Sequence, residues 1–199
     1  MNSNEPNTKA LGKAKVNWAG PDFWCVYADG YKRAAEILIE SPKNIYETNT
    51  IIFPILALYR HYVELSLKEI IAYGQYLDGK GSIPDDEHDL KQLWGCAKNY
   101  IRKYYLGFEQ LSRMEQLVYE VYEIDPTSQA ARYPYVKHKD KNKRTKAGSF
   151  SDAPPFLSLD ALKAHIHELG GLLSDVTGYL AVSQDLEAEA RSILRENYP

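Results

Sequence analysis

Five stretches of the chain place apolar residues three and four positions apart, which is the spacing of one face of an α-helix. The first stretch is predicted to begin near Pro21 and to end before Ser41. Its pattern indicates a helix with one buried side and one solvated side. The apolar face consists of Trp24, Tyr27, Tyr31, Ala34 and Leu38.

The second stretch is the most apolar part of the chain. Apolar residues cover more than half of its helical circumference, which indicates a central helix with neighbours on several sides. They are Ile51, Ile52, Ile55, Leu58, Tyr59, Tyr62, Val63, Leu65, Leu67, Ile70 and Ile71. Pro54 is best tolerated in a first turn, where no intrahelical hydrogen bond is lost. This helix is therefore predicted to start between Asn49 and Phe53.

Two shorter helices are predicted on either side of Gly107. Acidic residues at positions 85 to 87 precede the first of them, where they lie at the positive pole of the helix dipole. The apolar face of this helix is formed by Leu90, Leu93, Ala97, Tyr100 and Tyr104. The face of the next helix is formed by Leu111, Met114, Val118 and Val121.

The last stretch is the longest, and Ser158 is a good N-cap for it. Its apolar residues follow an a/d order over three heptads. They are Leu159, Leu162, Ile166, Leu169, Leu173, Val176 and Leu180. Gly170 and Gly171 weaken this helix. The tail from residue 184 to 199 is either its polar continuation or a separate short helix.

No segment of comparable length alternates apolar and polar residues as a half-buried strand does. The alternating lysines at 137, 139, 141 and 143 lack an apolar face. The predicted class is therefore all-α, a bundle of four or five helices. A basic loop of about thirty residues, from Asp125 to Leu157, precedes the last helix, and connections of this length commonly carry function.

The chain of 199 residues is long enough for one substantial core and short for two. We expect a single domain over residues 18–183, with a disordered leader at 1–17 and a polar C-terminal segment at 184–199. The composition, 44% apolar and 26% charged, is that of a soluble globular protein. The first residues lack a secretory apolar region, and no run approaches the ~20 apolar residues of a membrane span. Cys25 and Cys96 form no CxxC pair, which favours reduced thiols and a cytoplasmic location.

Charge is concentrated between Arg132 and Lys146. Seven of these fifteen residues are basic and only Asp140 is acidic, a net of +6 in a chain whose total is -3. Such a local positive field suits phosphate groups of nucleic acid, nucleotide or lipid. The basic residues that would attract a nucleic-acid backbone are Lys137, Lys139, Lys141, Lys143, Arg144 and Lys146. The alternative interpretation is a solvated loop that Arg132 anchors to the bundle.

A narrow polar stripe interrupts the apolar second helix. Arg60, His61, Glu64 and Lys68 fall within about 80° of one another at about 100° per residue. One interpretation is a solvated face, on which Glu64 bridges Arg60 and Lys68. The other is a polar groove inside the bundle, where the charges face one another and a bound anion such as a nucleotide phosphate.

His88 and Asp89 open the third helix and also have two interpretations. They either cap the helix locally, or they extend the anion-binding groove by bringing an imidazole close to the polar stripe. A metal site drawn from His61, Glu64, His88 and His138 has no supporting HxxxH, HExxH or CxxC spacing. Glycine-rich phosphate loops and nucleophile elbows are absent as well. We therefore expect neither a metal nor a cofactor.

Arg132 and His138 have the residue types that metal-independent RNA cleavage requires. The reaction needs a base for the 2′-hydroxyl proton and a fixed cation for the developing phosphate charge. An imidazole with its usual pKa of about 6.5 suits the first task, and the guanidinium fork of arginine suits the second. The sequence thus nominates His138 as general base or acid and Arg132 as phosphate stabiliser.

Several short strings together resemble the HEPN-like proteins, the all-helical bacterial family named for higher-eukaryote and prokaryote nucleotide binding. The strings are residues 58–68 (LYRHYVELSLK), His88-Asp89-Leu90, residues 125–128 (DPTS) and Arg132-Tyr133-Pro134. The resemblance covers residues 50 to 180. It implies an all-α bundle, frequent homodimers and, in many members, a metal-independent ribonuclease with an Arg-x4-6-His motif, often in toxin–antitoxin or phage-defence settings. Arg132 and His138 match that spacing, although Pro134 prevents a regular helix through the motif.

Two hypotheses follow from these patterns. The first is an HEPN-like ribonuclease or RNA-binding effector that uses Arg132, His138 and the lysine run. The second is a non-catalytic HEPN-like module that binds a nucleotide or a protein partner, such as an antitoxin, through the Arg60 stripe. In either case we expect a homodimer, because of the long a/d stripe of the last helix and the 16 tyrosines, and no membrane partner.

Overall fold

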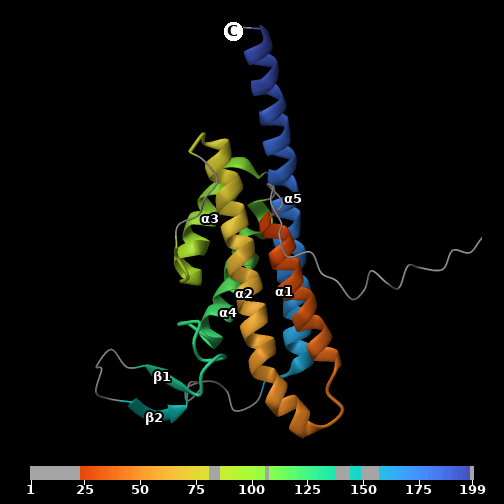
Figure 1. Cartoon of the computed structure of the whole chain (residues 1–199), viewed down its shortest axis with the longest axis vertical. Coiled ribbons are helices and arrows are strands. Elements are labelled where there is room, and N and C mark those ends of the chain that lie inside the picture. Colours follow the sequence, from red (N-terminus) through yellow and green to blue (C-terminus); the bar gives the residue numbers. More distant parts are fainter. Residues whose placement is uncertain (1–22, 81–85, 106–107, 138–143, 149–156, 198–199) are drawn as a thin grey trace, which may run out of the picture.

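The computed structural model describes residues 23–80, 86–105, 108–137, 144–148 and 157–197 (Figure 1). The predicted all-α class is confirmed, with a bundle of five helices in the described part of the chain. These are α1 (Phe23–Glu40), α2 (Ile45–Leu77), α3 (Leu90–Tyr104), α4 (Leu111–Ile124) and α5 (Leu159–Asn197). A short 3-10 turn, Phe108–Gln110, leads into α4.

Helix α2 lies at the centre of the bundle, as its all-round apolar pattern predicted. It packs against α1, α3 and α5 and touches α4. Every residue from Tyr62 to Gly74 is buried. A helix enclosed in this way must also bury the polar residues that interrupt its sequence, so the stripe beginning at Arg60 lies inside the molecule.

The predicted start of α2 between Asn49 and Phe53 is wrong, because the helix begins at Ile45. Asn44 caps it by accepting the Glu47 N–H at 3.0 Å, and the Glu47 carboxylate in turn accepts the Lys43 N–H at 2.7 Å. This reciprocal cap stabilises the first turns. Pro54 consequently lies in the helix interior. The predicted start was wrong because it assumed that Pro54 lies in the first turn, whereas the helix holds this proline in its interior.

Helix α5 runs without interruption through Leu159–Asn197, so the tail from residue 184 onward continues it as far as Asn197. The predicted N-cap is present, since Ser158 Oγ accepts the Ala161 N–H at 3.2 Å. The a/d stripe is buried in the chain's own core from Leu162 to Leu180. This stripe therefore offers no surface to a second copy, and a homodimer requires another interface.

The basic loop before α5 contains a small hairpin that the sequence did not predict. Strands β1 (Tyr135–Lys137) and β2 (Arg144–Gly148) pair antiparallel, with Tyr135 opposite Gly148 and Lys137 opposite Arg144. A two-stranded ribbon needs only backbone pairing, so the missing apolar face did not prevent it. The hairpin lies at the end of the bundle opposite the C-terminal end of α5 (Figure 1).

Candidate functional site

A recess of about 240 Å³ lies between α1, α2 and the turn that follows α4. It brings together Arg60 and His61 of the polar stripe and Arg132 of the basic segment, which are far apart in the sequence. Its other walls are partly apolar, so it can contact both a charged group and a hydrophobic one. They are formed by Tyr31, Ala57, Leu58, Asp125 and Ser128.

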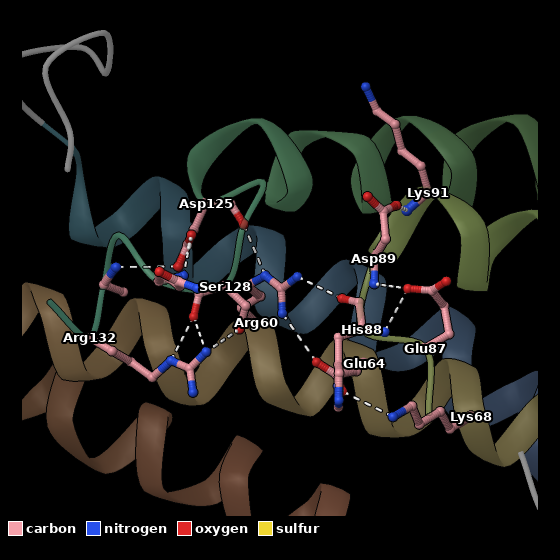
Figure 2. A network of polar contacts seen from close by, with 12 residues as sticks. Arg60, Glu64, Lys68, Glu87, His88, Asp89, Lys91, Asp125, Ser128 and Arg132 are labelled. Carbon is pink, nitrogen blue, oxygen red and sulfur yellow. Dashed lines mark hydrogen bonds and ion pairs between the residues drawn. The ribbon is translucent and has the colours of Figure 1, made fainter. Parts of the chain in front are cut away.

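Arg60 joins three parts of the chain at the inner side of this recess. The residue is only 3% exposed. Its guanidinium donates to the Asp125 carbonyl at 3.0 Å, to the Glu64 carboxylate at 3.1 Å and to the His88 carbonyl at 2.9 Å (Figure 2). The turn after α4 and the segment before α3 are thereby both fixed to α2.

Glu64 is the common partner of the buried cations. Besides Arg60 it binds Lys68 Nζ at 3.2 Å and His88 Nδ1 at 2.7 Å. Burial alone raises the pKa of Glu64, but hydrogen bonds from His88 and Lys68 outweigh it and hold the pKa below its usual value. The carboxylate is therefore ionised, and the interpretation of the stripe as a solvated face is wrong. Its charges face one another, as the groove interpretation required.

His88 and Asp89 have separate tasks. Asp89 caps α3 by accepting the backbone N–H groups of Lys91 and Gln92 at 2.8 and 3.1 Å. His88 reaches back to Glu64, while its side chain remains 68% exposed. Asp89 therefore caps the helix locally, as the first interpretation predicted, whereas His88 contacts the polar stripe, as the second predicted. Neither residue lines the recess, and the same is true of Glu64 and Lys68.

The turn that carries Arg132 is organised by Asp125. This buried carboxylate accepts the backbone N–H groups of Gln129, Ala130 and Ala131 at 2.9, 3.1 and 3.2 Å. Its own carbonyl is held by Arg60. The tight turn places Ser128 in the left-handed region at φ 58°, which is uncommon for a residue other than glycine. The position of the turn on α2 therefore depends on buried contacts.

Arg132 ends this turn with an exposed side chain. Its Nε donates to the Ser128 carbonyl at 2.6 Å, its Nη2 donates to the same oxygen, and Nη2 also contacts Ser128 Oγ at 3.1 Å (Figure 2). Both acceptors are neutral, and no carboxylate among the described residues pairs with this guanidinium. Its positive charge is therefore available to an anion in the recess. The non-helical backbone from Arg132 to Pro134 agrees with the effect predicted for Pro134.

His61 supplies an uncharged imidazole to the same recess. Its ring meets that of Tyr31 edge to face, with centroids 4.4 Å apart. Burial lowers the pKa of His61, and the positive charges of Lys68, Arg132 and Arg60 lower it further against the opposing effect of Glu64. At neutral pH the ring can therefore accept a proton or hydrogen-bond an anionic ligand.

The basic segment is described only in part. Lys137, Arg144 and Lys146 belong to the strands of the hairpin, close in sequence to Arg132. His138, the predicted catalytic histidine, lies outside the described residues. So do Lys139, Lys141 and Lys143 of the predicted nucleic-acid track.

Sequence reasoning did not assign a role to Asp125 or Ser128, although both shape the recess. They entered only through the DPTS string of the family resemblance. An Asp-Pro pair followed by Ser is a turn signature, because Asp side chains readily accept nearby backbone N–H groups. That signal favours an ordered turn before Arg132, but it gives no indication of what the turn packs against.

Other kinds of site have no counterpart in the described part of the chain. No three His, Cys, Asp or Glu residues there are placed to hold a metal ion. Cys25 and Cys96, both among the described residues, form no disulfide bond. None of the described helices has the length and apolar character needed to cross a bilayer.

Comparison with known proteins yields no matching family model, no matching curated sequence and no matching solved structure. The functional argument therefore depends on the residues and geometry of the recess.

Proposed function

We propose that the protein binds RNA or a nucleotide, with a phosphate group held in the recess by Arg132 beside His61, while Arg60 fixes the turn that carries Arg132. The observation that carries this proposal is the convergence of these three residues on one recess. Arg132 is the most important residue for this proposal, because among the described residues its guanidinium bonds only to neutral oxygens of Ser128. A phosphate offers a guanidinium stronger, charge-assisted hydrogen bonds than a carbonyl does.

The neighbouring basic segment supports RNA as the ligand. It follows Arg132 in the sequence and contains six further cations between Lys137 and Lys146. Such cations attract the nucleic-acid backbone regardless of sequence and make affinity depend on salt. Tyr31 adds an aromatic ring at the wall of the recess, which suits stacking with a base.

The test is the binding of single-stranded RNA, measured by fluorescence anisotropy at several salt concentrations. Arg132→Gln should weaken binding and reduce the salt slope by about one unit, since one phosphate contact is lost. Arg102→Gln removes the same charge from an exposed position on α3 and should leave both quantities nearly unchanged. Equal effects of the two variants, or no binding at low salt, would reject the recess as the phosphate site.

Cleavage of the bound RNA is a second candidate function, because the recess holds a neutral imidazole together with Arg132. His61, or His138 as the Arg-x5-His spacing predicts, would take the proton from a 2′-hydroxyl. The O2′–P bond would form, the P–O5′ bond would break, and a 2′,3′-cyclic phosphate would remain. The resemblance to HEPN-like proteins extends this candidate to a toxin or phage-defence role.

Gel analysis of labelled RNA in EDTA distinguishes cleavage from binding alone. A metal-independent ribonuclease should retain its activity under these conditions. Arg132→Ala and the variant of the acting histidine, His61→Ala or His138→Ala, should each lower the rate by roughly 10². RNA that is bound but left intact identifies the protein as a non-catalytic nucleotide- or RNA-binding module.

A further inference from the structure

The last part of α5 exposes a second apolar stripe, distinct from the buried one. The buried stripe ends at Leu180. Beyond it Val182, Leu186, Ile193 and Leu194 are 60%, 62%, 51% and 58% exposed. At about 100° per residue Val182, Leu186 and Ile193 lie within about 40° of one another, on a face rotated by more than a third of a turn from the buried stripe. Leu194 lies at the same angle as the buried Val176, between the two faces.

This stripe faces away from the chain's own packing. Apart from Leu194, the side of α5 that continues the buried stripe becomes polar after residue 183. There Arg191 binds Glu187 at 2.9 Å and lies 5.5 Å from the Tyr76 ring at the end of α2. The helix projects beyond the rest of the bundle at this point (Figure 1). Single exposed apolar residues are ordinary, but a clustered stripe on a projecting helix is typical of an interaction surface.

The charges beside the stripe specify the kind of partner. Asp185, Glu189 and Glu196 fall along one edge of it, within about 40° of one another at about 100° per residue. An antiparallel pair of two copies would bring the acidic edges together. A parallel pair would set each acidic edge against a side whose nearest basic residue, Arg191, already pairs with Glu187, so self-association is disfavoured in both cases. A helix with basic residues beside its apolar face would match both the apolar contact and the charges.

We propose that the C-terminal part of α5 is a docking surface for an amphipathic α-helix of a protein partner that carries lysine or arginine beside its apolar face. The surface is separate from the proposed RNA site, because no residue of α5 lines the recess and the hairpin lies at the other end of the bundle (Figure 1). It therefore adds a protein partner that does not depend on RNA binding.

The probe is a synthetic peptide of about three heptads, with leucine at the a and d positions and lysine at e and g, so that its charges keep it monomeric. Binding is measured by fluorescence anisotropy of the labelled peptide. We expect the intact protein to bind it and Leu186→Asp to bind it roughly tenfold more weakly or worse. Ala188→Asp adds the same charge on the other side of the helix and should not weaken binding.

Charge recognition is tested with the matching peptide that has glutamate at e and g. The double variant Glu189→Lys, Glu196→Lys should prefer this acidic peptide, which reverses the selectivity of the original protein. Ile193→Ser, which introduces no charge, provides a second apolar variant. Circular dichroism and unchanged RNA binding show that each variant remains folded.

Three results would overturn the proposal. The first is failure of the lysine peptide to bind the intact protein. The second is equal binding to the intact protein, Leu186→Asp and Ile193→Ser. The third is sedimentation that shows a dimer of the intact protein and a monomer of Leu186→Asp, since the occupant of the stripe would then be a second copy.

Discussion

The buried Arg60 guanidinium is shielded from water and makes three hydrogen bonds within the protein, so its removal affects three other groups. Without it, the buried Glu64 carboxylate loses a partner and the carbonyls of His88 and Asp125 lose their donor. We expect Arg60→Gln to lower the free energy of unfolding by about 3 kcal/mol, a cost typical of breaking a buried ion pair. Urea denaturation measures this quantity.

Arg33→Gln is the matched control for this prediction. Arg33 also pairs with a glutamate on its own helix, Glu36, but its side chain is 72% exposed. Exposed pairs of this kind contribute little to stability, so this variant should unfold nearly as the original protein does. Similar small losses in both variants would contradict a central role for Arg60.

His61 gives folding stability a defined dependence on pH. Its pKa lies below the ordinary value of 6.5 in the folded protein, chiefly through burial, so the unfolded chain binds this proton more readily. The stability that the neutral ring contributes is complete above about pH 6.5 and is lost as pH falls through the lowered pKa. His61→Gln should therefore lose less stability than the original protein between about pH 7.5 and pH 5.5 in urea titrations.

Phosphate affinity should increase as the pH falls, whereas the stability contributed by His61 decreases. A protonated His61 adds a positive charge beside Arg132, so RNA binding at fixed ionic strength should tighten as the imidazole is protonated. His61→Gln should remove this part of the pH dependence. The pKa of Glu64 lies below its ordinary value of 4.5, so this carboxylate does not take up a proton in the pH range where His61 does. An identical pH profile for the variant would argue against contact between His61 and the ligand.

At the scale of helices, the sequence was most informative where a buried face repeats. The apolar patterns of α2 and α5 identified the central helix and the long last helix, and Ser158 indicated where α5 begins. The first turns of α2 were missed, because Pro54 was expected in the first turn, whereas the Asn44 cap starts the helix well before it. The hairpin was missed because backbone pairing alone leaves no apolar pattern.

The site was less predictable for a related reason. Arg60, His61 and Arg132 could each be selected by chemistry, but their meeting in one recess depends on how the turn after α4 packs on α2. That packing depends on Asp125. Its carboxylate accepts backbone N–H groups of the turn, and its carbonyl accepts a hydrogen bond from Arg60 on α2. Contacts between such distant segments carry no local sequence pattern.

The cap of α2 leads to a prediction about this helix. Asn44→Ala removes the acceptor for the Glu47 N–H and should lower stability by about 1 kcal/mol. Hydrogen exchange should accelerate in residues 45–53, before the buried part of the helix begins. Ser41→Ala, which removes a hydroxyl just before the helix, should leave exchange in these turns unchanged. Unaltered exchange in Asn44→Ala would show that packing, not the cap, fixes the start.

Within the whole protein, the two proposed surfaces share no residue, because the recess is lined by α1, α2 and the turn after α4, whereas the apolar stripe belongs to the end of α5. The 39 residues of α5 span about 58 Å at 1.5 Å per residue. RNA at the recess and a basic helix at residues 182–194 should therefore bind together without competition. A saturating amount of the lysine peptide should change the RNA dissociation constant less than about twofold, well under the usual coupling between linked sites. Displacement of RNA by the peptide would contradict this arrangement.

The central position of α2 also has a consequence for folding during synthesis. Helix α1 precedes α2 closely in the chain and α3 follows it closely. The contact of α2 with α5, by contrast, joins residues as far apart as Tyr59 and His165, which are separated by 106 positions. Loop closure over such a distance is costly and slow. Until α5 has emerged from the ribosome, the side of α2 that packs against α5 in the folded protein therefore remains exposed, although α2 is the most apolar helix of the molecule. We expect this side of α2 to bind a chaperone during synthesis, because the central helix is made early and its last packing partner is made late.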